Sequence, residues 1–169
     1  MASTIANELR NKSDAAWANL TRQLQGMEPY MERSDAPGQW TTRQVLAHLL
    51  GETGWRPVDF LKKFSMTDLP PGEITPGQSH VTPERQKMAL PQFLDALDSR
   101  RRDIFAYLET LSEADLQGRK ARIPLFKQSM GTDEIPIQVY VGVVLDLHLN
   151  DHAGQLAKIR KAVGLPEAK

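Results

Sequence analysis

Two histidines, His148 and His152, lie four residues apart near the end of this 169-residue chain. The apolar spacing around them indicates a helix, which would place both imidazoles on one face with Cβ atoms about 5–6 Å apart. Because metal–imidazole bonds are about 2.0–2.1 Å long, two such rings can share one ion. A third histidine, His48, lies in another apolar helical stretch far upstream. Together the three predict a divalent-metal site between two packed helices, with at least one coordination position open.

A structural role for the same histidines is the alternative. His148 lies in an apolar run, and an unpartnered imidazole is costly to bury, so a metal or a polar group must face it. Glu52 and Asp151 are carboxylates that could fill that role. Asp151, however, would point roughly 100° away from each neighbouring histidine on a helix, so we expect it at the surface. Gln155 follows His152 by about one turn and could line the same groove.

Glu52 is the candidate catalytic residue, because it follows His48 by one helical turn. It could serve as a fourth ligand, orient a ligating imidazole or accept a proton. The alternative is an exposed helical glutamate without a special role. The fourth histidine, His80, lies in a loop rich in proline and glycine, residues 68–83, and we expect it to be exposed unless that loop folds over the site.

The three tryptophans have structural interpretations as well. Trp55, just after Glu52, is the best candidate for an aromatic pocket wall. We expect Trp17 in the core or on a dimer face, and Trp40 as an anchor for the loop that enters the second helix.

Four long stretches have apolar residues at intervals of three and four, which predicts helices over about 3–27, 41–64, 82–111 and 137–163. Ser3, Thr41 and Thr82 are suitable N-caps. Breaks are expected where proline and glycine interrupt the second helix, and a bend at Pro91 in the third. No alternating run is long enough to predict a sheet. The sequence therefore predicts one all-α domain, residues 1–169, folded as a four-helix bundle with a long crossover connection.

Two long segments connect these helices. Residues 68–83 are predicted to form the longest loop, which would shape or cover the site. Residues 112–136 are weakly patterned and are predicted to cross the bundle.

Composition and charge exclude several classes of function. Lys+Arg and Asp+Glu both number 21, so the formal net charge is zero and the excess of basic residues typical of nucleic-acid binding is missing. The basic runs at 100–102 and 158–161 are interpreted as solvated helix faces. The chain has no cysteine, which excludes disulfides, cysteine-based zinc sites and a cysteine nucleophile.

Nothing in the sequence predicts a membrane or secretory address. The N-terminal segment lacks a basic region followed by an apolar run. The longest apolar stretch, residues 139–149, is interrupted by Asp146 and His148 and is too short to span a bilayer. We therefore expect a cytoplasmic protein without a membrane partner.

Two segments carry a family resemblance. Residues 38–49, GQWTTRQVLAHL, resemble the DinB-like four-helix-bundle proteins, in which a tryptophan opens the second helix and a histidine follows two turns later. Residues 148–156, HLNDHAGQL, are similar to the other motif of that family, two histidines at spacing four followed by glutamine and an aliphatic residue. The resemblance covers essentially the whole chain in the order and spacing of the helices.

The resemblance implies a bundle with one long crossover, often a homodimer, that binds a divalent metal through His48, His148 and His152. Nickel, zinc, iron and manganese are all associated with the family. Relatives include transferases and isomerases that use low-molecular-weight thiols such as mycothiol or bacillithiol, and hydrolase activity is proposed for others. Mycothiol-dependent relatives often carry a further C-terminal domain, which is not expected here, so thiol selectivity is not carried over.

The leading functional hypothesis is a metal-dependent transferase or hydrolase acting on a small molecule, with Glu52 as proton acceptor. A metal held by three neutral imidazoles lowers the pKa of a bound water or thiol. The alternative is a noncatalytic, metal-stabilised or dimeric interaction bundle, which a closed four-ligand site would favour.

Overall fold

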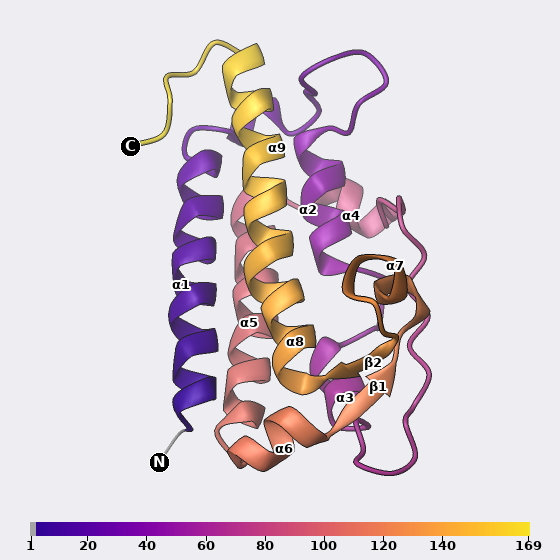
Figure 1. The fold of residues 1–169 in the computed structure, drawn as a ribbon. Helices are drawn as coiled ribbons and strands as arrows, with labels where there is room; N and C mark the ends of the chain where they lie inside the picture. Colours follow the sequence, from indigo (N-terminus) through magenta and orange to yellow (C-terminus); the bar gives the residue numbers. More distant parts are fainter. Residues whose placement is uncertain (1–2) are drawn as a thin grey trace.

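The computed structural model describes residues 3–169, and long helices dominate it (Figure 1). In chain order its elements are α1 (Thr4–Leu24), η1 (Glu28–Tyr30), α2 (Thr42–Leu50), α3 (Pro57–Leu61), α4 (Pro83–Lys87), α5 (Leu90–Leu108), α6 (Glu113–Gly118), β1 (Lys120–Arg122), η2 (Pro124–Phe126), α7 (Lys127–Met130), β2 (Glu134–Pro136), α8 (Ile137–Gly142), η3 (Val143–Leu147) and α9 (His148–Ala162).

Four helical rods form the predicted bundle: α1, α2, α5 and the continuous α8–η3–α9 helix. α1 packs against α5 and α9, and α2 packs against the same two helices, so α1 and α2 lie diagonally opposite. In Figure 1, α1 and α9 run upward while α2 and α5 run downward. Because α2 and α5 run in the same direction, the chain between them must return along the length of the bundle. Residues 62–82 make this crossover.

The predicted helix starts are confirmed at three caps. The Oγ of Ser3 accepts a hydrogen bond from the Ala6 amide at 3.0 Å. Thr41 and Gln44 form a reciprocal capping box at the start of α2, and Thr82 caps α4 through the Arg85 amide. Each cap satisfies an amide that the first turn of a helix leaves without a partner.

The third predicted helix is two helices. α4 ends at Lys87 and α5 begins at Leu90, with Pro91 in its first turn. Proline lacks the amide hydrogen and its ring clashes with the carbonyl four residues earlier, so a helix continuing from α4 through Pro91 is blocked. The predicted bend is therefore a full break.

The last helix spans the predicted range but contains a π-helical turn, η3, between α8 and α9. Such turns are frequent at functional sites. Here the turn ends immediately before His148. Neither the apolar spacing nor the composition predicted it.

Two predictions about residues 112–136 are wrong. This segment contains a small antiparallel hairpin, in which Ala121 of β1 pairs with Ile135 of β2. Its strands have only three residues each, too few to produce a recognisable alternation. The segment also leaves and rejoins the bundle at the same end instead of crossing it (Figure 1).

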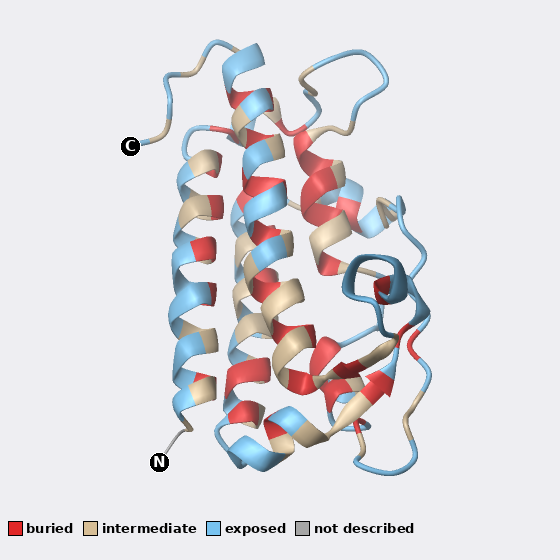
Figure 2. Cartoon of the chain, viewed as in Figure 1, coloured by how far each residue is buried: buried red, intermediate tan, exposed pale blue. Residues whose placement is uncertain are grey.

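The core lies between the four helical rods, where buried residues face inward (Figure 2). One cluster joins α1, α2, α5 and α9 near the start of α2, and a second joins α3, the hairpin, α5 and α8. Among residues 3–169, no helix is long and apolar enough to cross a bilayer. The histidines lie where α2 and α9 pack together.

Candidate metal centre

The structure brings His48, His148 and His152 together at the contact between α2 and α9. Nε2 of His148 lies 3.0 Å from Nε2 of His48 and 3.0 Å from Nε2 of His152. The ligand atoms of all three lie within 4.8 Å of one another. Two nitrogens about 2.1 Å from one ion are roughly 3.0 Å apart when their bonds meet near 90°. The spacing therefore fits three imidazoles around one ion.

The opposite ring nitrogens are held by oxygen atoms. Nδ1 of His48 lies 2.6 Å from the carbonyl oxygen of Gln78, and Nδ1 of His152 lies 2.9 Å from Oε1 of Gln155. Oxygen acceptors require the proton on Nδ1, which leaves both Nε2 atoms as lone-pair donors. The predicted contact of Gln155 with this groove is confirmed. The two partners are a carbonyl and an amide, not the carboxylates Glu52 and Asp151.

This tautomer pattern makes the cluster unfavourable unless a cation occupies it. If Nε2 of His48 and of His152 both present lone pairs, the single Nε2 hydrogen that His148 could carry can satisfy only one of them. At least one nitrogen–nitrogen contact at 3.0 Å then has no proton between its atoms. A divalent metal removes that repulsion by accepting all three lone pairs, so the donor set fits a metal.

Burial keeps two of the imidazoles neutral. Burial, followed by the proximity of His152 and His48, lowers the pKa of His148 to about 3. The pKa of His152 is also lowered, chiefly by burial, with His48 acting in the same direction and Gln155 opposing it. Neutral imidazole is the form that binds metals, so at neutral pH no proton has to leave either ring.

Trp40 packs against the cluster. The centroid of its ring lies 4.9 Å from that of His48, and its plane is within 7° of parallel to that of His152. Trp40, predicted as a loop anchor, therefore also forms an apolar wall beside two of the imidazoles.

Arg85 fixes the loop that positions His48. Its buried guanidinium donates hydrogen bonds to the carbonyls of Ala47, Gly51 and His80. These bonds join the end of α2 to the loop that carries Gln78, the hydrogen-bond partner of His48. No local sequence signal identified Arg85, since its three acceptors are backbone carbonyls and two of them, at Ala47 and Gly51, are more than 30 residues away in the chain.

The prediction that Glu52 lies on the helix of His48 is wrong. α2 ends at Leu50, and Gly51 has φ 71°, a conformation that favours glycine. The chain therefore turns away, and Glu52 is exposed. Gly51 was the signal in the sequence that could have shown that α2 ends before Glu52. Within the described chain, Glu52 is not part of the three-histidine group.

His80 lies beside the cluster, because its loop folds back onto the bundle. Its ring stacks on that of His48 with centroids 6.3 Å apart and planes 14° apart. Its φ of 56° is unusual for a residue other than glycine. The pKa of His80 is lowered by burial, then by His48 and Arg85, while the nearby charge of Glu52 acts in the opposite direction.

A cavity inside the bundle reaches His148. The space in it that water can occupy has a volume of about 40 Å³, and its walls are mainly apolar. Its lining comes from α1, α2, α3, α5, η3 and α9: Trp17, Leu49, Pro57, Leu97, Arg100, Arg101, Ile104, Val144, Leu145, His148 and Leu149. Trp17, not Trp55, is the tryptophan that lines this cavity.

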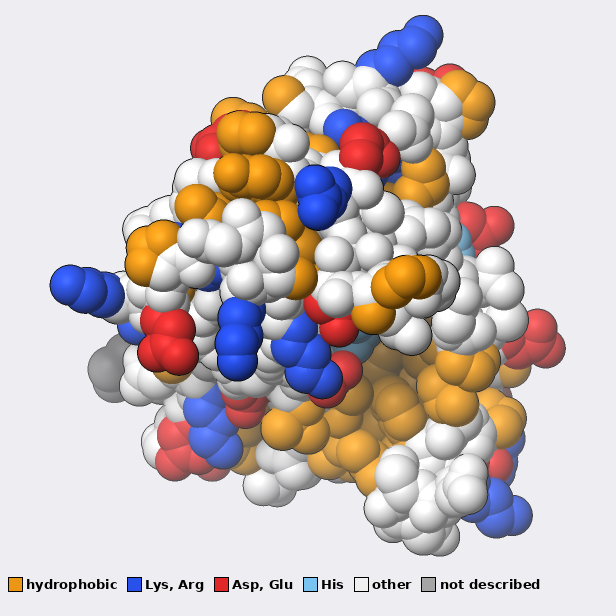
Figure 3. All heavy atoms as spheres, turned by 90° about the horizontal axis from the view of Figure 1, so that it is seen from above, with side chains coloured by type: hydrophobic (Ala, Val, Ile, Leu, Met, Phe, Trp, Pro, Cys, Tyr) orange, Lys and Arg blue, Asp and Glu red, His pale blue; other side chains and the backbone are white. Residues whose placement is uncertain are grey.

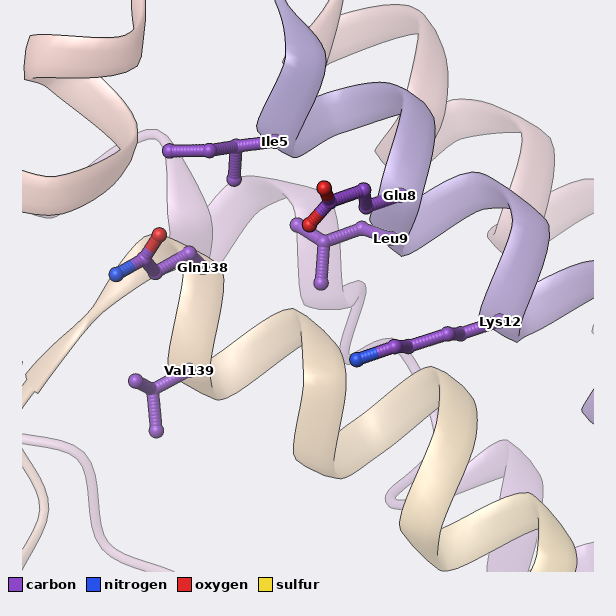
Figure 4. Close-up of a pocket in the computed structure, with 6 residues that line it drawn as sticks. All are labelled: Ile5, Glu8, Leu9, Lys12, Gln138 and Val139. Carbon is purple, nitrogen blue, oxygen red and sulfur yellow. The ribbon is translucent and has the colours of Figure 1, made fainter.

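Two further hollows lie on the molecule, one beside the histidines and one away from them. Seen from above, Figure 3 shows a hollow lined by hydrophobic side chains with histidine atoms at its edge. A larger cavity of about 230 Å³ lies between α1 and α8, where Figure 4 shows side chains from both helices. It contains no histidine and is lined by Ile5, Glu8, Leu9, Lys12, Gln138 and Val139. Its size alone therefore does not make it the candidate site.

The basic run 100–102 is only partly a solvated face. Arg102 is 70% exposed, as predicted, whereas the side chain of Arg101 is 15% exposed. Arg100 lines the cavity, and its Nη1 is buried. Asp151, by contrast, is exposed, as predicted.

Comparison with known proteins agrees with this architecture. The structure of YfiT from Bacillus subtilis superposes with a TM-score of 0.73 at 18% sequence identity, covering 98% of this chain and 92% of that one. YfiT is described as a probable metal-dependent hydrolase with an unusual four-helix bundle topology. This likeness confirms the predicted four-helix bundle. Comparison with curated protein sequences gives no match.

The family follows from the sequence match. A family model of the DinB superfamily matches residues 6–156, which include most of each of the four rods and all three histidines of the cluster. The resemblance inferred from the two histidine motifs is confirmed, and the chain belongs to the DinB superfamily.

Proposed function

We propose that this protein is a divalent-metal-dependent enzyme that acts on a small molecule. The observation that carries the proposal is the convergence of three Nε2 atoms whose rings are fixed by Gln78 and Gln155. Within residues 3–169, no carboxylate joins this group, so three protein ligands would leave a position open to water or substrate. That arrangement is typical of catalytic metal sites.

The residues around the cluster have separable roles. His48, His148 and His152 would hold the metal, and the oxygens of Gln78 and Gln155 would orient two of these rings. A bound divalent metal supplies a Lewis acid that lowers the pKa of a water or thiol. Glu52, which is exposed and whose charge acts on the pKa of His80, is proposed as the proton acceptor. Trp40 would keep water away from one side of the imidazoles.

Two reaction classes are proposed, in the order in which they should be tested. YfiT, which shares the fold, is described as a probable metal-dependent hydrolase, and this supports hydrolysis as the first activity to test. Thiol transfer is the second, and its thiol must come from a co-substrate because the chain has no cysteine. Nickel, zinc, iron and manganese all accept imidazole ligands. The homodimer, the cytoplasmic location and the single domain remain predictions from the sequence.

The first experiment measures metal in tag-free protein beside a His148→Ala/His152→Ala variant. We expect near-stoichiometric metal in the parent and none in the variant. The loaded protein is then assayed against ester, amide and thiol-addition substrates. Absence of metal from both proteins after reconstitution would refute the proposal. Metal in the parent, with chelation lowering its melting temperature and no activity in any assay, would favour the noncatalytic bundle instead.

A further inference from the structure

Arg100 occupies a position on α5 where the helix pattern calls for an apolar residue. The buried stripe of this helix consists of Phe93, Leu97, Ile104 and Leu108, which are at most 7% exposed. Arg100 follows Leu97 by three residues and precedes Ile104 by four, so it lies on the same face. Both of these neighbours line the cavity that reaches His148.

Arg100 is half-buried, and part of its guanidinium lacks a partner within residues 3–169. Its Nη1 is buried and has no hydrogen-bond partner in the described part of the chain. Arg101 and Arg102 differ in that both form ion pairs with Asp98, although Nε of Arg101 is also buried without a hydrogen-bond partner among the described residues. The nearby charges that act on Arg100 are two further guanidinium groups, those of Arg85 and Arg56, which together with burial lower its pKa.

An arginine in this position does not stabilise the fold. A buried guanidinium N–H group without an acceptor costs free energy, and an apolar residue of similar volume would avoid that cost. A negatively charged ligand would supply the missing partner and offset this cost. The cavity beside Arg100 provides the place, because its walls are otherwise mainly apolar and His148 lies on its lining.

We propose that this cavity binds the carboxylate of the substrate, with Arg100 as its anchor and the three-histidine cluster beside it. The inference rests on the proposed function, since it names the substrate class: a small carboxylic acid with an apolar body. The planar guanidinium offers parallel N–H groups that match the two oxygens of a carboxylate. The apolar walls formed by Leu97, Ile104 and Val144 would contact the hydrocarbon part.

The test compares butyrate with butyramide, which have the same size but differ in charge. Binding to the full-length protein is measured by calorimetry and by the indole N–H signal of Trp17, which lines the cavity. We expect butyrate to bind at least tenfold more tightly than butyramide in both the metal-loaded and the metal-free protein. Arg100→Met should abolish this preference, whereas the matched control Arg102→Met should keep it, because Arg102 is exposed and paired with Asp98.

Measurements of stability and metal affinity distinguish carboxylate binding by Arg100 from a structural role and from binding at the metal. We expect Arg100→Met to be as stable as the parent or more so, and to bind metal unchanged; Arg100→Lys should keep part of the carboxylate preference. If Arg100→Met does not fold, Arg100→Gln replaces it in every arm.

Equal binding of the two probes, or a preference that survives loss of Arg100, would overturn the inference. A preference seen only with metal and surviving Arg100→Met would assign the carboxylate to the metal. Failure to bind metal would refute the proposed function but leave the metal-free comparison decisive for Arg100.

Discussion

Nε2 of His48 lies 3.0 Å from Nε2 of His148, although 100 residues separate them in the chain. The contact joins the end of α2 to the start of α9. Each ring comes from a helix whose position depends on the whole bundle, so metal binding should couple to the packing of α2 against α9.

Loss of one ligand should weaken metal binding strongly. For His48→Ala we expect the dissociation constant to rise more than about 100-fold, because losing only a partner of a ligand already costs about 10–100-fold. Competition with a chromophoric chelator measures this constant. His80→Ala is the control, since His80 stacks on His48 but lies outside the three-histidine group. An equal loss in both variants would contradict the assignment.

Gln155 should control metal affinity without being a ligand. Gln155→Leu removes the oxygen that accepts the Nδ1 proton of His152, so that ring loses its fixed tautomer and orientation. We expect affinity to fall by about 10–100-fold. The same chelator assay applies, with Asp151→Asn as an exposed control on the same helix. Unchanged affinity in Gln155→Leu would show that the tautomer is set elsewhere.

Arg85 should be needed for both stability and metal binding. Arg85→Met leaves the carbonyls of Ala47, Gly51 and His80 without their donor, which should cost about 2–3 kcal/mol of unfolding free energy. Urea denaturation measures this loss. Metal affinity should fall as well, because the loop carrying Gln78 is released. Lys87→Met, an exposed change on α4, should leave both quantities near those of the parent.

The metal-free protein should lose stability as the pH falls below about 6.5. The folded protein holds the pKa of His148 at about 3, below its ordinary 6.5, so between these values the unfolded chain binds more protons than the folded one. Unfolding free energy therefore rises with pH across this window and is fully present above 6.5. The contribution lost at pH 5 is on the order of 2 kcal/mol. Urea unfolding at pH 5 and pH 7 measures it, and His148→Gln should flatten the dependence.

Glu52 should affect turnover without affecting metal content. Once a substrate is found, Glu52→Gln should lower kcat by about 10²–10⁴-fold if this carboxylate accepts the proton. Glu73→Gln, an exposed change in the neighbouring loop, is the control. A normal rate in Glu52→Gln would assign proton transfer to another group and leave Glu52 as a surface residue.

The sequence by itself determined much of the local structure. Ser3, Thr41 and Thr82 carry side-chain acceptors for the amides that follow them, so the starts of α1, α2 and α4 depend on adjacent residues only. The spacing of His148 and His152 places both on one face of any helix. These features predicted the bundle and grouped two of the candidate metal ligands before the helices were packed.

Where local signals in the sequence were weak or were outweighed by apolar spacing, the predicted structure is wrong. Gly51 turns the chain and removes Glu52 from the helix, and Pro91 separates α4 from α5. Both residues were visible in the sequence, but the apolar spacing on either side suggested continuity. The hairpin strands are too short to show an alternation.

Only the tertiary structure decided which distant groups meet. The carbonyl of Gln78 reaches His48 because Arg85 holds the intervening loop against α2. Arg100 belongs to a run of three arginines that looks uniformly solvated in sequence, yet its Nη1 is buried in the bundle. Such contacts join backbone and side-chain atoms from segments far apart in the chain. Helical periodicity fixes which face a residue occupies, but packing alone fixes what that face meets.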